Sequence, residues 1–227
     1  MILAAGLGKR MRPLTDHTPK PLLRVGGKPL LEYHIERLVA AGFNELVINV
    51  AHLGQQIVEY CGSGSQWGAD IVFSPEQEPL ETAGGIVRAL PLLGDSAFAV
   101  VNGDIWTDYP FERLREPRLP TAGAHLVLVS NPPQHPLGDF MLDDQALVRE
   151  KSPQRSGFTF SGVGLYSPQF FAGVTQTKAA LRPLFTAAIQ RGALAGELYR
   201  GAWRDIGTPE RLSALDGQLN SAQSSVQ

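Results

Sequence analysis

The chain has 227 residues, of which 43% are hydrophobic and 19% are charged, and its formal net charge is −2. This is the composition of a soluble globular protein with enough residues for one substantial core. The near-neutral charge excludes a general electrostatic preference for nucleic acid or for an anionic membrane. We expect neither a membrane span nor a signal peptide, because no apolar run is long enough. The single cysteine, Cys61, excludes an internal disulfide and is compatible with a reducing cytosol, so we expect a cytoplasmic protein.

Apolar runs alternate with helical patterns along the first half of the chain. The patterns predict short buried strands over residues 2–5, 46–50, 71–74 and 98–101, and helices over residues 31–39, 55–61 and 82–90. Gly42 is expected to end the first helix, and the Thr82 side chain to cap the third. Such an alternation is typical of a mainly parallel sheet with helices on its faces.

The second half has shorter, more closely spaced strand patterns. We expect strands over residues 125–131, 140–142, 147–151 and 158–166, helices over 168–171 and 179–191, a last strand region over 194–206, and a closing helix from Pro209. We therefore predict one α/β domain over residues 1–220, with a Rossmann-like, mixed but mainly parallel sheet flanked by helices. Its halves would be 1–123, with a nucleotide-binding pattern, and 124–220, and residues 221–227 would form a frayed tail.

A basic, glycine-containing loop follows the first strand, in "ILAAGLGKRMRPLT". Gly6 and Gly8 allow the backbone to approach an anion closely, and Lys9 and Arg10 supply positive charge. Lys20 stands between two prolines in "PKP" and is held for a specific contact. The P-loop and dinucleotide patterns do not fit the loop. The sequence thus indicates a rigid triphosphate cradle, and a surface turn without function is the alternative.

Two aspartates stand where ligands bind in open α/β sheets, beyond the carboxyl ends of strands. Asp104 follows a buried strand in "VVNGDIW", and Asp205 stands in "WRDIGT" near the other end of the chain. Mg²⁺ commonly takes one or two carboxylates and completes its shell with phosphates and water. The pair therefore suggests a magnesium site. The alternative is that Asp104 is a turn residue and that Asp205 is a cap or a surface acid.

The stretch "LAAGLGKRMRPLT" followed by "PKPLL" resembles the signature of the sugar-1-phosphate nucleotidyltransferases. The resemblance implies a GT-A-like nucleotidyltransferase fold and Mg²⁺-dependent transfer of a nucleotidyl group from a nucleoside triphosphate to a sugar 1-phosphate. It also implies that Arg10 and Lys20 are catalytic and that Asp104 and Asp205 hold the metal. The family's first strand is usually a few residues longer, so the first strand is expected to be short here. The implied nucleotide contacts are Ala4, Ala5, Gly6, Gly8, Lys9, Arg10, Glu76, Thr82, Gly84 and Asn102.

The stretch "SPEQEPLETAGGI" is the expected base-reading segment, in which small residues such as Gly84 let a flat ring approach. Many family members have a glutamine near the position of Glu76 and a glycine at that of Glu81. A carboxylate only accepts hydrogen bonds. It could accept from uracil N3–H or from the two donors of guanine, so the residue chemistry leaves both UTP and GTP open. The start of a helix without ligand contacts is the alternative.

The second half is expected to bind the sugar phosphate. "REKSP" contains Glu150 and Lys151, similar to a Glu-Lys pair that the family uses, although an exposed charged hairpin fits equally. Asp139, Ser161 and Gly162 lie on loops that a sugar could contact.

Several stretches, including "VVNGDIWTDY", "FSGVGLY" and "YRGAWRDIGTPERL", look most like the N-acetylmuramate-1-phosphate uridylyltransferases of peptidoglycan recycling. The resemblance implies small-molecule substrates, UTP and the sugar 1-phosphate, and no nucleic-acid or membrane partner. The sequence does not indicate an oligomeric state. Two alternatives stay open: the same reaction with GTP or another triphosphate and a mannose-, heptose- or glucose-type 1-phosphate, and a catalytically silent nucleotide-sugar sensor.

Overall fold

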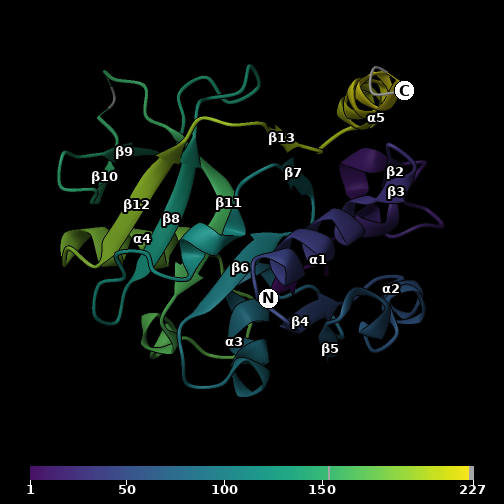
Figure 1. Ribbon diagram of the computed structural model, residues 1–227. Coiled ribbons are helices and arrows are strands. Elements are labelled where there is room, and N and C mark those ends of the chain that lie inside the picture. Colours follow the sequence, from purple (N-terminus) through teal and green to yellow (C-terminus); the bar gives the residue numbers. More distant parts are fainter. Residues whose placement is uncertain (153, 225–227) are drawn as a thin grey trace. The chain divides into compact units, whose positions relative to one another are not determined.

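The computed structural model describes residues 1–152 and 154–224 (Figure 1). Backbone contacts divide the chain into two compact units. The N-terminal unit comprises residues 2–79, 102–110 and those from 203 onward, and the central unit comprises residue 1, 80–101 and 111–202. None of the helices in the described ranges is both long and apolar enough to cross a membrane.

The N-terminal unit is built from both ends of the chain. Its strands are β1 (Ile2–Leu3), β2 (Arg24–Val25), β3 (Lys28–Pro29), β4 (Glu45–Val50), β5 (Asp70–Pro75), β7 (Ile105–Thr107) and β13 (Trp203–Asp205). Its helices are α1 (Leu30–Ala40), α2 (Gly54–Cys61) and α5 (Pro209–Ser224), with short 3₁₀ helices η1 (Lys9–Met11), η2 (Lys20–Leu22) and η3 (Ser65–Trp67).

A parallel sheet with the order β1-β4-β5 forms the base of this unit. Residues 46–50 of β4 are all buried, which explains why the strand is a nearly continuous run of β-branched and apolar residues. Two small antiparallel pairs, β2 with β3 and β7 with β13, complete the unit. In the second pair Asp205 lies opposite Ile105, so distant parts of the sequence become neighbours.

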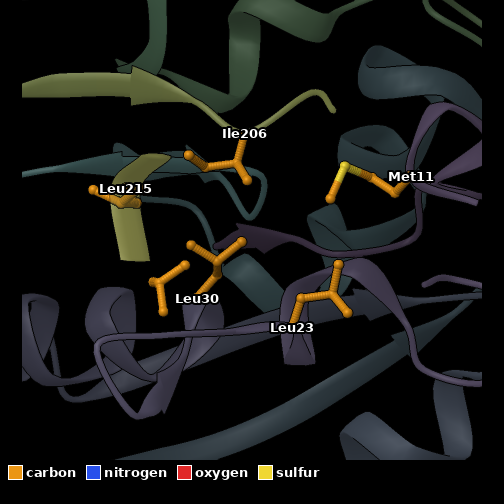
Figure 2. Close-up of a cluster of buried hydrophobic side chains, with 6 residues drawn as sticks. Met11, Leu23, Leu30, Ile206 and Leu215 are labelled. Carbon is orange, nitrogen blue, oxygen red and sulfur yellow. The ribbon is translucent and has the colours of Figure 1, made fainter. Parts of the chain in front are cut away.

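A buried apolar cluster joins the two ends of the chain inside the N-terminal unit (Figure 2). Met11 and Ile206 are both fully buried in it, and each directly follows a predicted site residue. Burying such side chains contributes roughly 1.5–3 kcal/mol each, so the cluster fixes the backbone next to Arg10 and Asp205. Its buried members are Met11, Leu23, Val25, Leu30, Ile206 and Leu215.

The central unit contains a mixed sheet with the strand order β12-β8-β11-β6, in which β12 is parallel to β8 and the other two pairings are antiparallel. Its strands are β6 (Phe98–Asn102, its last residue in the N-terminal unit), β8 (Ala124–Val129), β9 (Phe140–Leu142), β10 (Val148–Glu150), β11 (Thr159–Tyr166) and β12 (Leu194–Tyr199). Its helices are α3 (Glu81–Leu93) and α4 (Leu181–Gln190), with 3₁₀ helices η4 (Phe111–Leu114) and η5 (Pro168–Phe171).

The predicted fold class, an α/β protein with a mixed, mainly parallel sheet and flanking helices, is confirmed. The first-half strands and helices lie within about three residues of their predicted bounds, and Gly42, with φ 83°, ends α1 as expected. The single domain over 1–220 and its division at residue 123 stay predictions.

Three details of the predicted helices, strands and tail were wrong. Thr82 lies inside α3 rather than capping it, because the N–H groups of Ala83 and Gly84 donate to the backbone oxygen of Ala179 instead. The last strand region is two separate strands, β12 and β13. The tail is helical as far as Ser224, since α5 is held at Leu215 in the buried cluster; the rest of the predicted tail, residues 225–227, lies outside the described residues.

Candidate active site

The loop after β1 is shaped by Gly8, which has a left-handed backbone conformation with φ 60°. The N–H of Met11 and the hydroxyl of the buried Thr15 both donate to the Gly8 oxygen, at 2.8 and 2.9 Å. A Cβ at Gly8 would lie 2.9 Å from Thr15 Cγ2, so the close contact requires glycine. Gly6 has open space around its Cα, whereas Ala4 and Ala5 are buried. Lys9 and Arg10 in η1 are exposed.

Lys20 and Asp104, two residues predicted to handle the reacting phosphates and the metal, are in direct contact. Lys20 Nζ donates to Asp104 Oδ2 at 2.8 Å. The lysine side chain is 9% exposed and the aspartate side chain 42%. The lysine is therefore held in the protein interior, whereas the aspartate is accessible from solvent. Gly103 precedes the aspartate, and its N–H donates to the oxygen of Leu3 at 2.8 Å. Asp104 is thereby fixed beside the end of β1, where the basic loop begins.

Asp205 is brought to Asp104 by the pairing of β7 with β13. The N–H of Ile206 donates to the backbone oxygen of Asp104 at 3.0 Å. The Asp205 carboxylate forms an ion pair with Arg211 of α5 at 2.5 Å. A Cβ at Gly207 would lie 2.9 Å from Nη1 of Arg211 and 3.3 Å from Nη1 of Arg10. The arginine predicted to be catalytic and the two aspartates predicted to bind a metal therefore gather in one part of the N-terminal unit.

Glu76 follows the carboxyl end of β5 and is 6% exposed. Its Oε1 accepts a hydrogen bond from Asn49 Nδ2 at 2.7 Å, and its backbone N–H donates to the oxygen of Val50 at 2.8 Å. Asn49 Oδ1 in turn accepts from the N–H of Ala4 at 2.7 Å. A continuous polar chain thus links the start of the basic loop to the predicted base-reading acid. Asn102, the remaining predicted nucleotide contact in this unit, ends β6 just before Gly103.

His34 of α1 supports the segment that follows Asp104. The imidazole is buried, and its Nε2–H donates to the backbone oxygen of Ile105 at 2.9 Å. Its Nδ1 has no hydrogen-bond partner among the described residues. Burial, and secondarily the nearby Arg37 charge, lower the pKa of His34 to about 4, against the opposing effects of the Ile105 hydrogen bond and Asp104. The folded protein therefore favours the neutral form of the His34 imidazole.

The lowered pKa of His34 predicts a specific loss of stability in mild acid. Between about pH 6.5 and pH 4 the unfolded chain binds a proton that the folded chain does not, so the free energy of unfolding falls as the pH falls through this window. The full loss would be about 3 kcal/mol. We expect urea denaturation to show this dependence in the parent and a weaker one in His34→Gln. Parallel curves of stability against pH for the two proteins would contradict the assignment.

In the central unit, the predicted base-reading residues Thr82 and Gly84 lie in the first turn of α3. A Cβ at Gly84 would lie 2.3 Å from the backbone oxygen of Thr177, so the chain's own packing already requires this glycine. Glu81 has φ 60°, a conformation that favours glycine, at the position where many relatives are expected to have glycine.

The predicted sugar-phosphate residues divide into two groups within the central unit. Asp139 Oδ2 accepts from the N–H of Phe160 at 2.9 Å. The prediction that Ser161 and Gly162 lie on a loop was wrong, because they form a bulge within β11, where the register of its pairing with β8 shifts. Lys151 Nζ donates to the Gly138 oxygen at 2.7 Å, which places it near Asp139.

Glu150 has different partners from this group. It accepts hydrogen bonds from Arg182 at 2.6 Å and from Thr186 at 2.8 Å, both on α4. Burial opposes its charge, but these two bonds and the Arg182 charge outweigh that effect and lower its pKa. Glu150 is therefore already engaged in joining β10 to α4.

Sequence reasoning missed Asn49 and Arg211. Asn49 was detectable in principle, because it is an amide in the middle of the buried run "LVINV", where a polar side chain needs a partner. Arg211 had no comparable signal. It meets Asp205 only because α5 turns back toward β13.

A parallel sheet, a basic glycine loop after its first strand and two aspartates paired with cations define an enzyme of the nucleotide-binding α/β class. A family model described as nucleotidyl transferase matches residues 1–221. The chain belongs to the nucleotidyl transferase family, and it is an enzyme of that type.

Two curated relatives are similar over nearly the whole chain. The N-acetylmuramate alpha-1-phosphate uridylyltransferase of Neisseria meningitidis serogroup B is 50% identical over 93% of this chain and 94% of its own length. The protein of the same name from Caulobacter vibrioides is 33% identical over 98% of this chain and 97% of its own length. Among solved structures, HddC from Yersinia pseudotuberculosis complexed with GMP-PN has a TM-score of 0.79 at 24% identity, covering 96% of this chain and 97% of that one, which shows the shared fold.

Proposed function

We propose that the protein transfers a uridylyl group from UTP to N-acetylmuramate 1-phosphate, giving UDP-N-acetylmuramate and pyrophosphate, in the cytoplasm and with Mg²⁺. Peptidoglycan recycling would be its physiological setting. One observation carries the chemistry: Arg10, Lys20, Asp104 and Asp205, from four separate segments, gather in the N-terminal unit. The similarity to the two uridylyltransferases supports the choice of substrates.

The donor set fits Mg²⁺. The backbone oxygen of Asp104 accepts from the N–H of Ile206, the residue after Asp205, and each of the two carboxylates forms an ion pair with a cation of the protein itself. Across residues 1–152 and 154–224, no group of three or more potential ligands is placed to enclose a metal. Two carboxylates suffice for Mg²⁺, which takes further oxygen ligands from phosphates and water. When bound, the ion would neutralise the charge on the phosphates of the nucleotide.

The protein's own residues would act mainly by positioning and by charge. The loop from Gly6 to Arg10 offers backbone N–H groups and a guanidinium to the triphosphate. An oxygen of the sugar 1-phosphate attacks the α-phosphorus, a new P–O bond forms, and the bond to the β-phosphate breaks with release of pyrophosphate. The attacking phosphate is already ionised at neutral pH, so no general base is needed. Lys20 and Arg10 would stabilise the negative charge that develops as this bond breaks.

The alternative is the same reaction with GTP and a mannose-, heptose- or glucose-type 1-phosphate. It is favoured by Glu76, since a carboxylate also suits the donors of guanine. A catalytically silent sensor is less consistent with the site, because Lys20 and Arg10 are of most use to a transition state.

The test is pyrophosphate release with Mg²⁺, in which UTP, GTP, CTP and dTTP are each combined with the 1-phosphates of N-acetylmuramate, N-acetylglucosamine and mannose. We expect a clear preference for UTP with N-acetylmuramate 1-phosphate. Preference for another pair of substrates would overturn the substrate assignment but not the proposed nucleotidyl transfer. No release from folded protein that binds nucleotide would overturn the enzymatic proposal and support the sensor.

A further inference from the structure

Asp205, one of the two proposed metal ligands, already has a cation of the protein on its carboxylate. Arg211 Nη1 donates to Asp205 Oδ2 at 2.5 Å, and the side chains of the arginine and the aspartate are only 28% and 27% exposed. A hydrogen bond between two charged groups is stronger than one between neutral groups. Asp104 has the same arrangement with Lys20. The two carboxylates and their two cations therefore carry no net charge together.

The fold holds Arg211 in this position. Arg211 lies in the first turn of α5, and Leu215, four residues later on the same face of the helix, is 2% exposed in the buried cluster. The side chain of Asp216 accepts from the N–H of Gly26 at 2.8 Å, which ties the helix to the turn between β2 and β3. The guanidinium thus reaches Asp205 from a helix that is anchored at two further points.

A second guanidinium borders the same space. A Cβ at Gly207 would lie 2.9 Å from Arg211 Nη1, 3.2 Å from Asp205 Oδ1 and 3.3 Å from Arg10 Nη1. The glycine therefore leaves open a small space that all three polar groups border. Arg10 is exposed and is proposed to bind the triphosphate. One arginine that holds a carboxylate and one that is proposed to bind phosphate thus meet beside a proposed metal ligand.

We propose that Arg211 is a counter-ion that keeps Asp205 from binding a free divalent cation, so that the carboxylate accepts a metal only together with a nucleotide. This inference rests on the proposed function, in taking Asp104 and Asp205 as metal ligands. A free cation would add uncompensated positive charge to carboxylates that are already neutralised. A triphosphate carries more negative charge than one divalent cation neutralises, so the guanidinium of Arg211 favours the complex of metal and nucleotide.

The test compares the binding of Mn²⁺ alone, followed by electron paramagnetic resonance, with the calorimetric binding of UTP in the presence of Mn²⁺ and without a sugar phosphate. Arg211→Met removes the charge and keeps much of the apolar stem. We expect this variant to bind Mn²⁺ alone roughly 10-fold more tightly than the parent, and UTP with Mn²⁺ roughly 10-fold more weakly. Arg211→Lys keeps the charge and should lie closer to the parent in both measurements.

Arg24→Gln controls for the loss of one positive charge elsewhere in the same unit. Arg24 is exposed and donates to the backbone oxygen of Gly27, so its replacement should leave both measurements as in the parent. Thermal melting of all four proteins controls for folding.

The opposite signs of the two expected shifts make the inference falsifiable. If Arg211 only supported the structure of the site, Arg211→Met would bind both Mn²⁺ alone and UTP with Mn²⁺ more weakly. Equal binding of Mn²⁺ alone by Arg211→Met and the parent would also overturn the counter-ion role, as would a parent that binds Mn²⁺ equally well with and without UTP. Neither measurement involves turnover. A parent that releases no pyrophosphate but shows the opposite shifts would therefore overturn the enzymatic proposal and support this inference.

Discussion

Replacing Lys20 with alanine is expected to lower turnover by roughly a hundredfold or more, as loss of a transition-state charge typically does. The lysine is nearly buried and its ammonium is held by Asp104 at 2.8 Å, so exposed neighbours such as Lys9 are poorly placed to replace it. The measurement is steady-state pyrophosphate release at saturating substrates. KM for the nucleotide should change less than kcat, because the charge is needed most when the bond to the leaving group breaks.

Lys20→Met separates charge from packing, since it keeps much of the apolar stem and removes the ammonium. We expect it to be as inactive as Lys20→Ala but closer to the parent in melting temperature. Near-normal turnover in either variant would exclude a catalytic role for Lys20.

Asp104→Asn is expected to raise the Mg²⁺ concentration for half-maximal activity by at least about tenfold, the loss commonly seen when a metal site is altered. The substitution keeps the size of the side chain and removes the charge that a divalent cation requires. It also leaves the buried Lys20 ammonium without its anionic partner. Titration with Mg²⁺ tests activity, and electron paramagnetic resonance of added Mn²⁺ tests metal binding independently of turnover.

Asp70→Asn is the matched control, because Asp70 is an exposed aspartate at the start of β5 in the same unit. We expect it to match the parent in both measurements. If the Mg²⁺ titration of Asp104→Asn overlays that of the parent, Asp104 is not a metal ligand.

The elements of the first half were predictable because their signals are local. The run "LVINV" is apolar and β-branched, as expected for a strand with both faces covered, and β4 lies there. Gly42 ended α1 where its position predicted, since the left-handed conformation it adopts favours glycine. The cap of α3 was not predictable, because Ala179, almost a hundred residues away, supplies the oxygen that a local side chain would otherwise provide.

The candidate site residues show the same contrast between local sequence signals and contacts made only in the folded chain. Arg10, Lys20, Asp104 and Asp205 could be predicted as candidates, because they stand beside glycines and prolines after apolar strands and match the signature of the resembled family. Their partners could not be named. The contact of Glu76 with Asn49 depends on the parallel register of β4 with β5, and that of Asp205 with Arg211 depends on the direction in which α5 leaves β13.

The sequence by itself determined the α/β class and the positions of most strands and helices, and it predicted which charged residues take part in phosphate and metal chemistry. These depend on periodicity and on side-chain chemistry, which act over a few residues. Only the tertiary structure decided that β7 pairs with β13, that Asp104 is bound by Lys20, and that Asn49 connects the basic loop to Glu76. These contacts join residues 27 to about 100 positions apart, and their geometry depends on how the whole chain buries its apolar surface.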